Sequence, residues 1–190
     1  MEKGPQERLY FDKKELAYIE RDIAHRRHIE RYTMLRQWCY GVVVDCACGC
    51  GYGTNLISKN PDVSYVYGID ISKSAIAWAN KNFAEENITF INDNMVKLTK
   101  YITDPIDVFV SIETIEHIKE TNEYLAMIQK TNPTKILLSY PIKKSTHYNK
   151  YHYYDFKEHE IITMFTQIGY RMTNVINLYQ EVALCQIEKQ

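Results

Sequence analysis

Small residues and carboxylates recur between residues 45 and 95 in a pattern that suits nucleotide binding. Asp45 opens the glycine-rich segment Asp45-Cys-Ala-Cys-Gly-Cys-Gly-Tyr-Gly53. Glycine tolerates a sharp turn and lets the backbone approach a ligand closely. Asp70 follows about 20 residues beyond the glycines, which is the usual placement of a carboxylate that binds ribose hydroxyls. Asp93 ends the next apolar run, where it is placed to meet an adenine amino group.

The same residues discriminate between two adenine-containing cofactors. A glycine-rich turn can exist without any ligand, but three acids at successive strand ends favour a bound one. A nicotinamide dinucleotide normally lies on G-x-G-x-x-G, whereas this chain has Gly49-x-Gly51-x-Gly53. Asp45 would also repel a pyrophosphate. A carboxylate suits the ammonium end of S-adenosylmethionine, which is therefore the expected cofactor.

A second group of chemically useful side chains lies further along the chain. Glu113, Glu116 and His117 follow an apolar run, and their spacing allows one helical turn to aim all three toward an acceptor. Together with His152 they would offer oxygen and imidazole ligands to magnesium, manganese or a similar ion. In a second interpretation, His117 or His152 is a general base and no ion is needed. In a third, Glu113 lies near the cofactor, Glu116 is solvated and His117 caps a helix. The candidate catalytic residues are thus Glu116, His117 and His152.

The stretch from Tyr140 to Tyr154 is aromatic and basic. It holds five tyrosines, three lysines and two histidines, and no acid. Tyrosine rings stack on sugars and bases, and lysines meet carboxylate or phosphate groups. This composition favours sugars, acidic sugars or nucleotides as acceptors.

The cysteines predict packing rather than metal binding. There are five, an odd number, and Cys46, Cys48 and Cys50 are spaced two apart. That spacing matches neither a disulfide framework nor the C-x-x-C pairs of a zinc site. We expect a reduced, cytoplasmic protein.

The elements that position these residues alternate between strand and helix patterns. Short apolar runs predict five parallel strands, and amphipathic stretches predict the helices between them. The strands are expected at residues 42–44, 65–69, 88–91, 108–112 and 136–138, and helices at 12–38, 73–83, 124–130 and 157–168. Residues 171–178 and 181–187 are separated by a tight turn and must pair antiparallel. The chain is therefore expected to form an α/β sheet with helices on both faces.

Length and charge exclude several classes of protein. With 190 residues and no break in composition, the chain is expected to be a single domain, residues 1–190, in which residues 1–40 form a helical cap over the cofactor site. A net charge of −1 argues against a surface that coats nucleic acid. No run approaches the roughly 18 apolar residues that would cross a bilayer, so no membrane partner is expected.

Nearly the whole chain resembles the class I, Rossmann-like methyltransferases that use S-adenosylmethionine. The likeness rests on VVVDCACGCGYGTNLIS, YGIDISKSAIAWA, ITFINDNM and VSIETIEHI, and it is greatest for small bacterial and phage enzymes associated with glycans. It implies a seven-stranded sheet of order 3-2-1-4-5-7-6 with strand 7 antiparallel. Asn149-Lys-Tyr151-His152 resembles the N-P-Y-H element that follows strand five in many of these enzymes, although proline is missing.

The resemblance also implies a role for individual residues at the cofactor. It implies that the methionyl end of the cofactor is bound by Asp45, Ala47, Gly49 and Gly51. Arg31 or Tyr32 would close over the carboxylate of the cofactor. It also implies that the ribose and adenine are bound by Asp70, Ile71, Asp93, Asn94 and Met95, and that Ser111 forms the floor of the pocket. The E-x-x-E-H pattern with a later histidine resembles the metal sites of two methyltransferase groups, one acting in ubiquinone synthesis and one on the 3′ ends of small RNAs.

These observations predict methyl transfer to a hydroxyl or amine of a small molecule or sugar. One alternative is a metal-assisted RNA 2′-O-methyltransferase, which the basic, aromatic stretch allows. Another is a non-catalytic subunit that binds the cofactor, which the intact glycine loop and three acids oppose.

Overall fold

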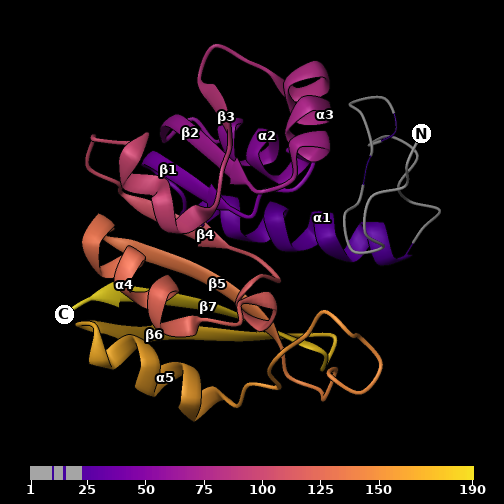
Figure 1. The fold of residues 1–190 in the computed structure, drawn as a ribbon, viewed down its shortest axis with the longest axis vertical. Helices are drawn as coiled ribbons and strands as arrows, with labels where there is room; N and C mark the ends of the chain where they lie inside the picture. Colours follow the sequence, from indigo (N-terminus) through magenta and orange to yellow (C-terminus); the bar gives the residue numbers. More distant parts are fainter. Residues whose placement is uncertain (1–9, 11–14, 16–22) are drawn as a thin grey trace. The chain divides into compact units, whose positions relative to one another are not determined.

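The computed structural model describes Tyr10, Glu15 and residues 23–190, and the chain divides into two compact units after Met95 (Figure 1). Within these described residues, seven strands form a sheet in the order β3-β2-β1-β4-β5-β7-β6. The predicted α/β class and strand order are therefore confirmed. None of the helices in the described part of the chain has the length and apolar character needed to cross a bilayer.

The first unit is built on three parallel strands. β1 spans Gly41–Cys46, β2 Val63–Asp70 and β3 Ile88–Asn92, and β2 pairs with both neighbours. α1 (Ile23–Leu35) packs against α2 (Tyr52–Ser58), and α2 packs on β2. Of the predicted helix 12–38, residues 23–38 are observed as α1 and the short helix η2 (Arg36–Trp38), while residues 12–14 and 16–22 lie outside the described residues.

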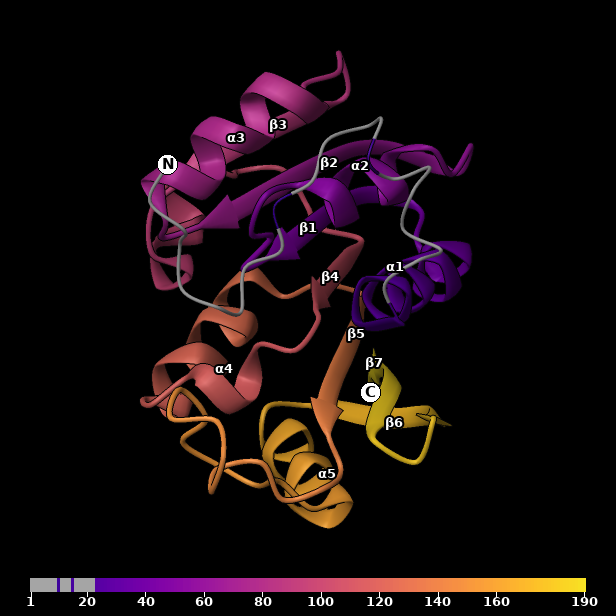
Figure 2. The ribbon, with the colours of Figure 1, turned by 90° about the vertical axis from the view of Figure 1, so that its right-hand side faces the viewer.

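Helix α3 (Lys73–Phe83) shows why the local sequence was predictive. Ser72 caps it, since its hydroxyl accepts a hydrogen bond from the backbone N–H of Ala75 at 3.3 Å. The apolar face predicted from the spacing, which includes Ala79 and Phe83, is buried. This face packs on β2 and β3 (Figure 2).

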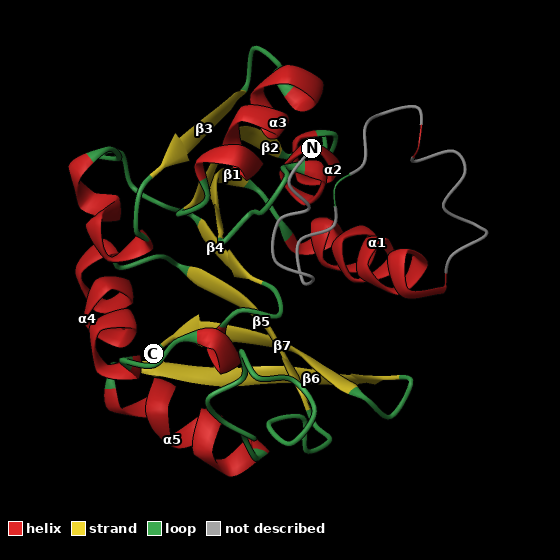
Figure 3. Cartoon of the chain, turned by 45° about the vertical axis from the view of Figure 1, so that its right-hand side comes forward, coloured by secondary structure: helices red, strands yellow, loops and turns green. Residues whose placement is uncertain are grey.

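The second unit combines parallel and antiparallel pairing. β4 (Val108–Ser111) pairs in parallel with β5 (Lys135–Pro141), and β7 (Val182–Lys189) lies antiparallel between β5 and β6 (Tyr170–Leu178). The helices are α4 (Thr121–Thr131) and α5 (Glu158–Gln167), with short helical turns η3 (Met95–Lys100) and η4 (Ile115–His117). Figure 3 shows α5 in red beside β6, and the long green loop that joins β5 to α5. The predicted terminal hairpin is confirmed.

Candidate active site

The glycine-rich loop between β1 and α2 turns sharply. Ala47, Gly49 and Gly51 all have positive φ angles, of 57°, 57° and 85°. Gly51 is also sterically required, because a Cβ there would lie 2.7 Å from the Cβ of Ala79 and from the Phe90 ring. A Cβ on Gly49 would meet no atom within 4 Å. The loop therefore contains one glycine that packing demands and one whose open side leaves backbone accessible to a ligand.

Asp45 is a fully buried carboxylate at the end of β1. Its two oxygens accept hydrogen bonds from the Thr54 hydroxyl at 2.7 Å and from the Tyr32 hydroxyl at 3.1 Å. Burial raises its pKa from 3.8 to about 7, although both hydroxyl groups oppose that shift. A cation beside Asp45 would restore the ionised form, so the group suits the positively charged end of S-adenosylmethionine.

The two residues of α1 that were predicted to close over the cofactor carboxylate are both buried. Tyr32 is buried and reaches Asp45, and its ring occupies the space into which a Cβ on Gly53 would project. Arg31, the other candidate for the cofactor carboxylate, is also buried. Helix α1 is thereby anchored to the glycine-rich loop within the first unit.

Asp70 and the residues after β3 lie at the same edge of the sheet as Asp45. The parallel register pairs Asp45 with Gly68 and Asp70 with Asn92. The Asp70 carboxylate accepts the backbone N–H of Gly49 at 3.0 Å and that of Ser72 at 2.7 Å. It thus fixes the glycine loop, a structural role that the motif alone did not indicate.

The remaining predicted cofactor residues differ in exposure. Ile71 is 67% exposed, which is unusual for isoleucine and leaves an apolar side chain available to an adenine ring. Asp93 is half-buried, and its carboxylate accepts the N–H of Asn94 at 2.7 Å. The Met95 sulfur lies 3.3 Å from the Cys46 thiol. Ser111 belongs to the second unit, where it is buried at the end of β4 and accepts the Tyr124 hydroxyl at 2.9 Å.

The cysteines are buried and chemically quiet. All five, which lie among residues 23–190, are free thiols. Burial raises the pKa of Cys46 and of Cys48 well above the usual thiol value, and Asp45 raises both further. A neutral buried thiol is a poor nucleophile, which is consistent with packing.

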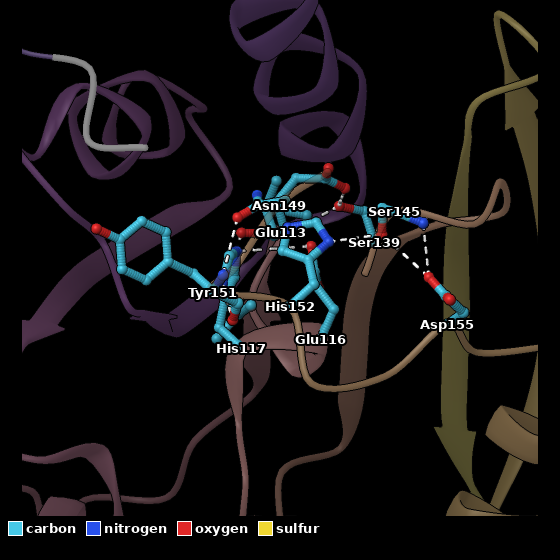
Figure 4. A network of polar contacts seen from close by, with 11 residues as sticks. Glu113, Glu116, His117, Ser139, Ser145, Asn149, Tyr151, His152 and Asp155 are labelled. Atoms are coloured by element: carbon cyan, nitrogen blue, oxygen red, sulfur yellow. Dashed lines mark hydrogen bonds and ion pairs between the residues drawn. The ribbon is translucent and has the colours of Figure 1, made fainter. Parts of the chain in front are cut away.

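Glu116, His117 and His152 converge in the second unit (Figure 4). One ligand atom from each lies within 4.8 Å of the others. Glu116 is 1% exposed, so the predicted solvated state of this side chain does not occur. The His117 Nε2 atom is 4.0 Å from a Glu116 oxygen, and the two imidazole rings lie edge to face with centroids 4.5 Å apart.

Hydrogen bonds to both Nδ1 atoms orient the two rings. The His117 Nδ1 lies 3.1 Å from the backbone carbonyl of Tyr151, and the His152 Nδ1 lies 2.6 Å from the Ser145 hydroxyl. A carbonyl can only accept, so the His117 Nδ1 is the donor in this contact, and in the neutral ring the lone pair then lies on Nε2. Asn149 forms the turn before His152, because its side chain accepts the N–H of Tyr151 and its carbonyl accepts that of His152.

Glu113 is not among the three residues whose candidate ligand atoms lie within 4.8 Å of one another. Its φ is +48° and the helical turn begins only at Ile115, so the expected single turn does not aim it with Glu116 and His117. Its carboxylate instead accepts a hydrogen bond from the Ser139 hydroxyl at 2.8 Å. The Ser139 hydroxyl oxygen in turn accepts a hydrogen bond from the backbone N–H of Glu113 at 3.0 Å.

Several polar partners were missed at the level of sequence. Thr54 bonds Asp45, and Ser145 joins His152 to Asp155. Ser145 and Asp155 flank a run of tyrosines and lysines and carry no recognisable spacing. Only the described fold brings them together.

Comparison with known proteins supports a methyltransferase. Residues 43–131 match a family model described as a methyltransferase domain. A search of curated protein sequences gives no significant match. Among solved structures, the chain is similar to the YcgJ protein of Bacillus subtilis, at 14% identity and a TM-score of 0.70, over 86% of this chain and 99% of that one.

Two further structures share the fold. Magnesium protoporphyrin IX methyltransferase from Synechocystis PCC 6803, solved with bound S-adenosylmethionine, is 17% identical with a TM-score of 0.67, over 91% of this chain and 84% of that one. The small RNA methyltransferase HEN1 is 15% identical with a TM-score of 0.69, over 98% of this chain and 27% of that one. Residues 43–131 thus match a methyltransferase domain, and the strand order 3-2-1-4-5-7-6 gives the described residues the methyltransferase fold.

Proposed function

We propose that the protein methylates a hydroxyl group of a small-molecule or saccharide acceptor, with a divalent ion held by Glu116, His117 and His152. The observation that carries the proposal is the convergence of these three side chains within 4.8 Å. One carboxylate and two imidazoles form a ligand set that suits first-row divalent ions such as manganese. The Nδ1 hydrogen bonds match the way proteins orient metal-ligating histidines.

Each residue has a defined part in this proposal. Glu116 supplies negative charge in a buried position, and His117 and His152 present ring nitrogens to the same point. An ion bound there would lower the pKa of a neighbouring hydroxyl, so that no strongly basic side chain is needed. In the rival mechanism, the ring nitrogen of His117 or His152 itself accepts the hydroxyl proton.

We assign the cofactor to the edge formed by β1, β2 and β3. Asp45 would meet the cationic methionyl end and Asp70 the ribose hydroxyls, while Ile71 would cover the adenine. The hydrogen bond from Tyr32 to Asp45 supports the proposal that residues 1–40 act as a cap within one methyltransferase domain.

The ion is tested first, because that test needs no acceptor. Metal-free protein is titrated with manganese and binding is measured by calorimetry. We expect one site in the native protein and about a hundredfold weaker binding in Glu116→Gln, with Glu123→Gln on the exposed face of α4 as the matched control. Equal manganese affinity in Glu116→Gln and the native protein would overturn the proposed ion site.

The acceptor is tested next. Formation of S-adenosylhomocysteine is followed with a panel of sugars and nucleotide sugars, with and without EDTA. Loss of turnover in EDTA, restored by manganese or magnesium, supports the ion. Full turnover in chelator would leave the histidines as bases.

RNA is the second candidate acceptor, and the loop between β5 and α5 favours it. Tyr148 and Tyr153 are 71% and 54% exposed and lie among lysines, an arrangement that stacks bases and attracts phosphate. The similarity to the fold of small RNA methyltransferase HEN1 is consistent with this candidate. Binding that depends only on phosphate falls with salt at a log–log slope of about −0.7 per contact on single strands. Submicromolar, salt-resistant binding to an RNA 3′ end would favour RNA over sugars as the methyl acceptor.

A further inference from the structure

Asp155, just before α5, collects an unusual number of hydrogen bonds. It accepts the backbone N–H groups of Ser145 at 2.6 Å and Thr146 at 3.0 Å, and the Thr146 hydroxyl at 2.6 Å. It also accepts the Ser145 hydroxyl at 3.3 Å. These donors, the Ser145 N–H foremost, hold the pKa of Asp155 well below its usual range. The carboxylate is therefore ionised and can only accept.

Ser145 links this carboxylate to His152. Its side chain is 1% exposed, and its oxygen lies 2.6 Å from the His152 Nδ1 (Figure 4). A serine hydroxyl has one proton to give. If that proton points to the anionic Asp155, the serine oxygen must accept from His152, and the imidazole proton lies on Nδ1. The lone pair of His152 is then on Nε2, the same arrangement that the Tyr151 carbonyl imposes on His117.

We propose that Ser145 and Asp155 are positioning residues that hold His152 in its Nδ1-protonated form, with Nε2 turned toward Glu116 and His117. The tautomer itself does not depend on the proposed function. Only the role of the Nε2 lone pair, as a metal ligand or as a base, rests on that function. In either use, the wrong tautomer would present an N–H where an acceptor is needed.

The tautomer is measured directly by long-range ¹H–¹⁵N correlation of the histidine rings in the full chain. We expect His152 to be protonated on Nδ1 in the native protein and to become mixed or protonated on Nε2 in Ser145→Ala and Asp155→Asn. Ser145→Ala keeps three of the four bonds to Asp155, so it tests the relay even if Asp155→Asn unfolds the loop. Thr146→Val is the matched control, since it removes one bond to Asp155 but none on the path to His152.

His117 provides an internal reference in the same spectra, because its Nδ1 bonds a backbone carbonyl and should not change. An Nε2-protonated His152 in the native protein would overturn the proposal. So would an unchanged tautomer in Ser145→Ala.

Manganese binding gives a second readout that separates this inference from the proposed function. Outer partners of a ligating histidine typically contribute about 10- to 100-fold in metal affinity, and we expect a loss of that size in Ser145→Ala but not in Thr146→Val. If the native protein binds no manganese, the metal function fails while the tautomer result still decides the relay. If it binds manganese and Ser145→Ala binds equally well, the relay is refuted and the metal site stands.

Discussion

Replacing Asp45 with asparagine should stabilise the protein without cofactor while weakening cofactor binding. The carboxylate is completely buried, and its raised pKa means that the ionised form is disfavoured in the folded state. Thr54 and Tyr32 both approach it with hydroxyl groups, which can donate or accept. An asparagine of the same shape can therefore keep both contacts without a buried charge.

The magnitude follows from the shift in pKa. A change from 3.8 to about 7 is roughly three pKa units, and one unit corresponds to about 1.4 kcal/mol, so the penalty has an upper limit of about 4 kcal/mol. Because the folded pKa is the higher one, the stabilising contribution of Asp45 is complete below pH 4 and is lost as the pH rises to 7. The stability gap between Asp45→Asn and the native protein should thus open between pH 4 and 7 and then stay constant.

Urea unfolding of both proteins without ligand, at intervals from pH 4 to 8, measures this gap. Asp62→Asn, an exposed aspartate before β2, is the matched control. Calorimetry with S-adenosylhomocysteine at pH 8 should show a loss of affinity in Asp45→Asn despite its greater stability. A gap that is independent of pH, or a native protein that is the more stable at pH 8, would refute the reasoning.

Three further predictions concern the same edge of the sheet. Gly51→Ala should lower the free energy of unfolding by about 2–5 kcal/mol, because it adds both backbone strain and overpacking. Gly49→Ala should lower it by only about 1–2 kcal/mol, because its positive φ is strained for alanine but its Cβ meets no atom. Equal losses for the two variants in urea unfolding would contradict this. Asp70→Asn should weaken S-adenosylhomocysteine binding about a hundredfold, because charge-assisted hydrogen bonds to ribose are lost, and an unchanged calorimetric affinity would remove the ribose assignment. Replacing Cys48 and Cys50 together by alanine should leave the fold intact; stoichiometric zinc in the native protein, absent from this variant, would reveal a metal site instead.

The sequence alone was sufficient for the alternation of elements and for the edge of the sheet that carries Asp45 and Asp70. Apolar periodicity is a local property, so the strands and the buried face of α3 could be read from the spacing. Parallel strands bring their carboxyl ends to one edge, which is why the acids at positions 45 and 70 could be expected together.

The tertiary structure decided what those side chains do. Glu113 and Glu116 are equivalent in the motif, but a positive φ at Glu113 sends one carboxylate to Ser139 and leaves the other beside His117. Spacing cannot reveal a backbone angle that is set by the packing around it.

The same limit applies to burial and to contacts between distant residues. The raised pKa of Asp45 comes from the complete removal of its carboxylate from water, which depends on residues such as Tyr32 that are remote along the chain. The bonds that join Asp155 through Ser145 to His152 form only once the loop after β5 has folded. Local patterns therefore predicted most of the elements that form, whereas long-range packing determined the burial, charge and hydrogen-bond partners of the candidate site residues.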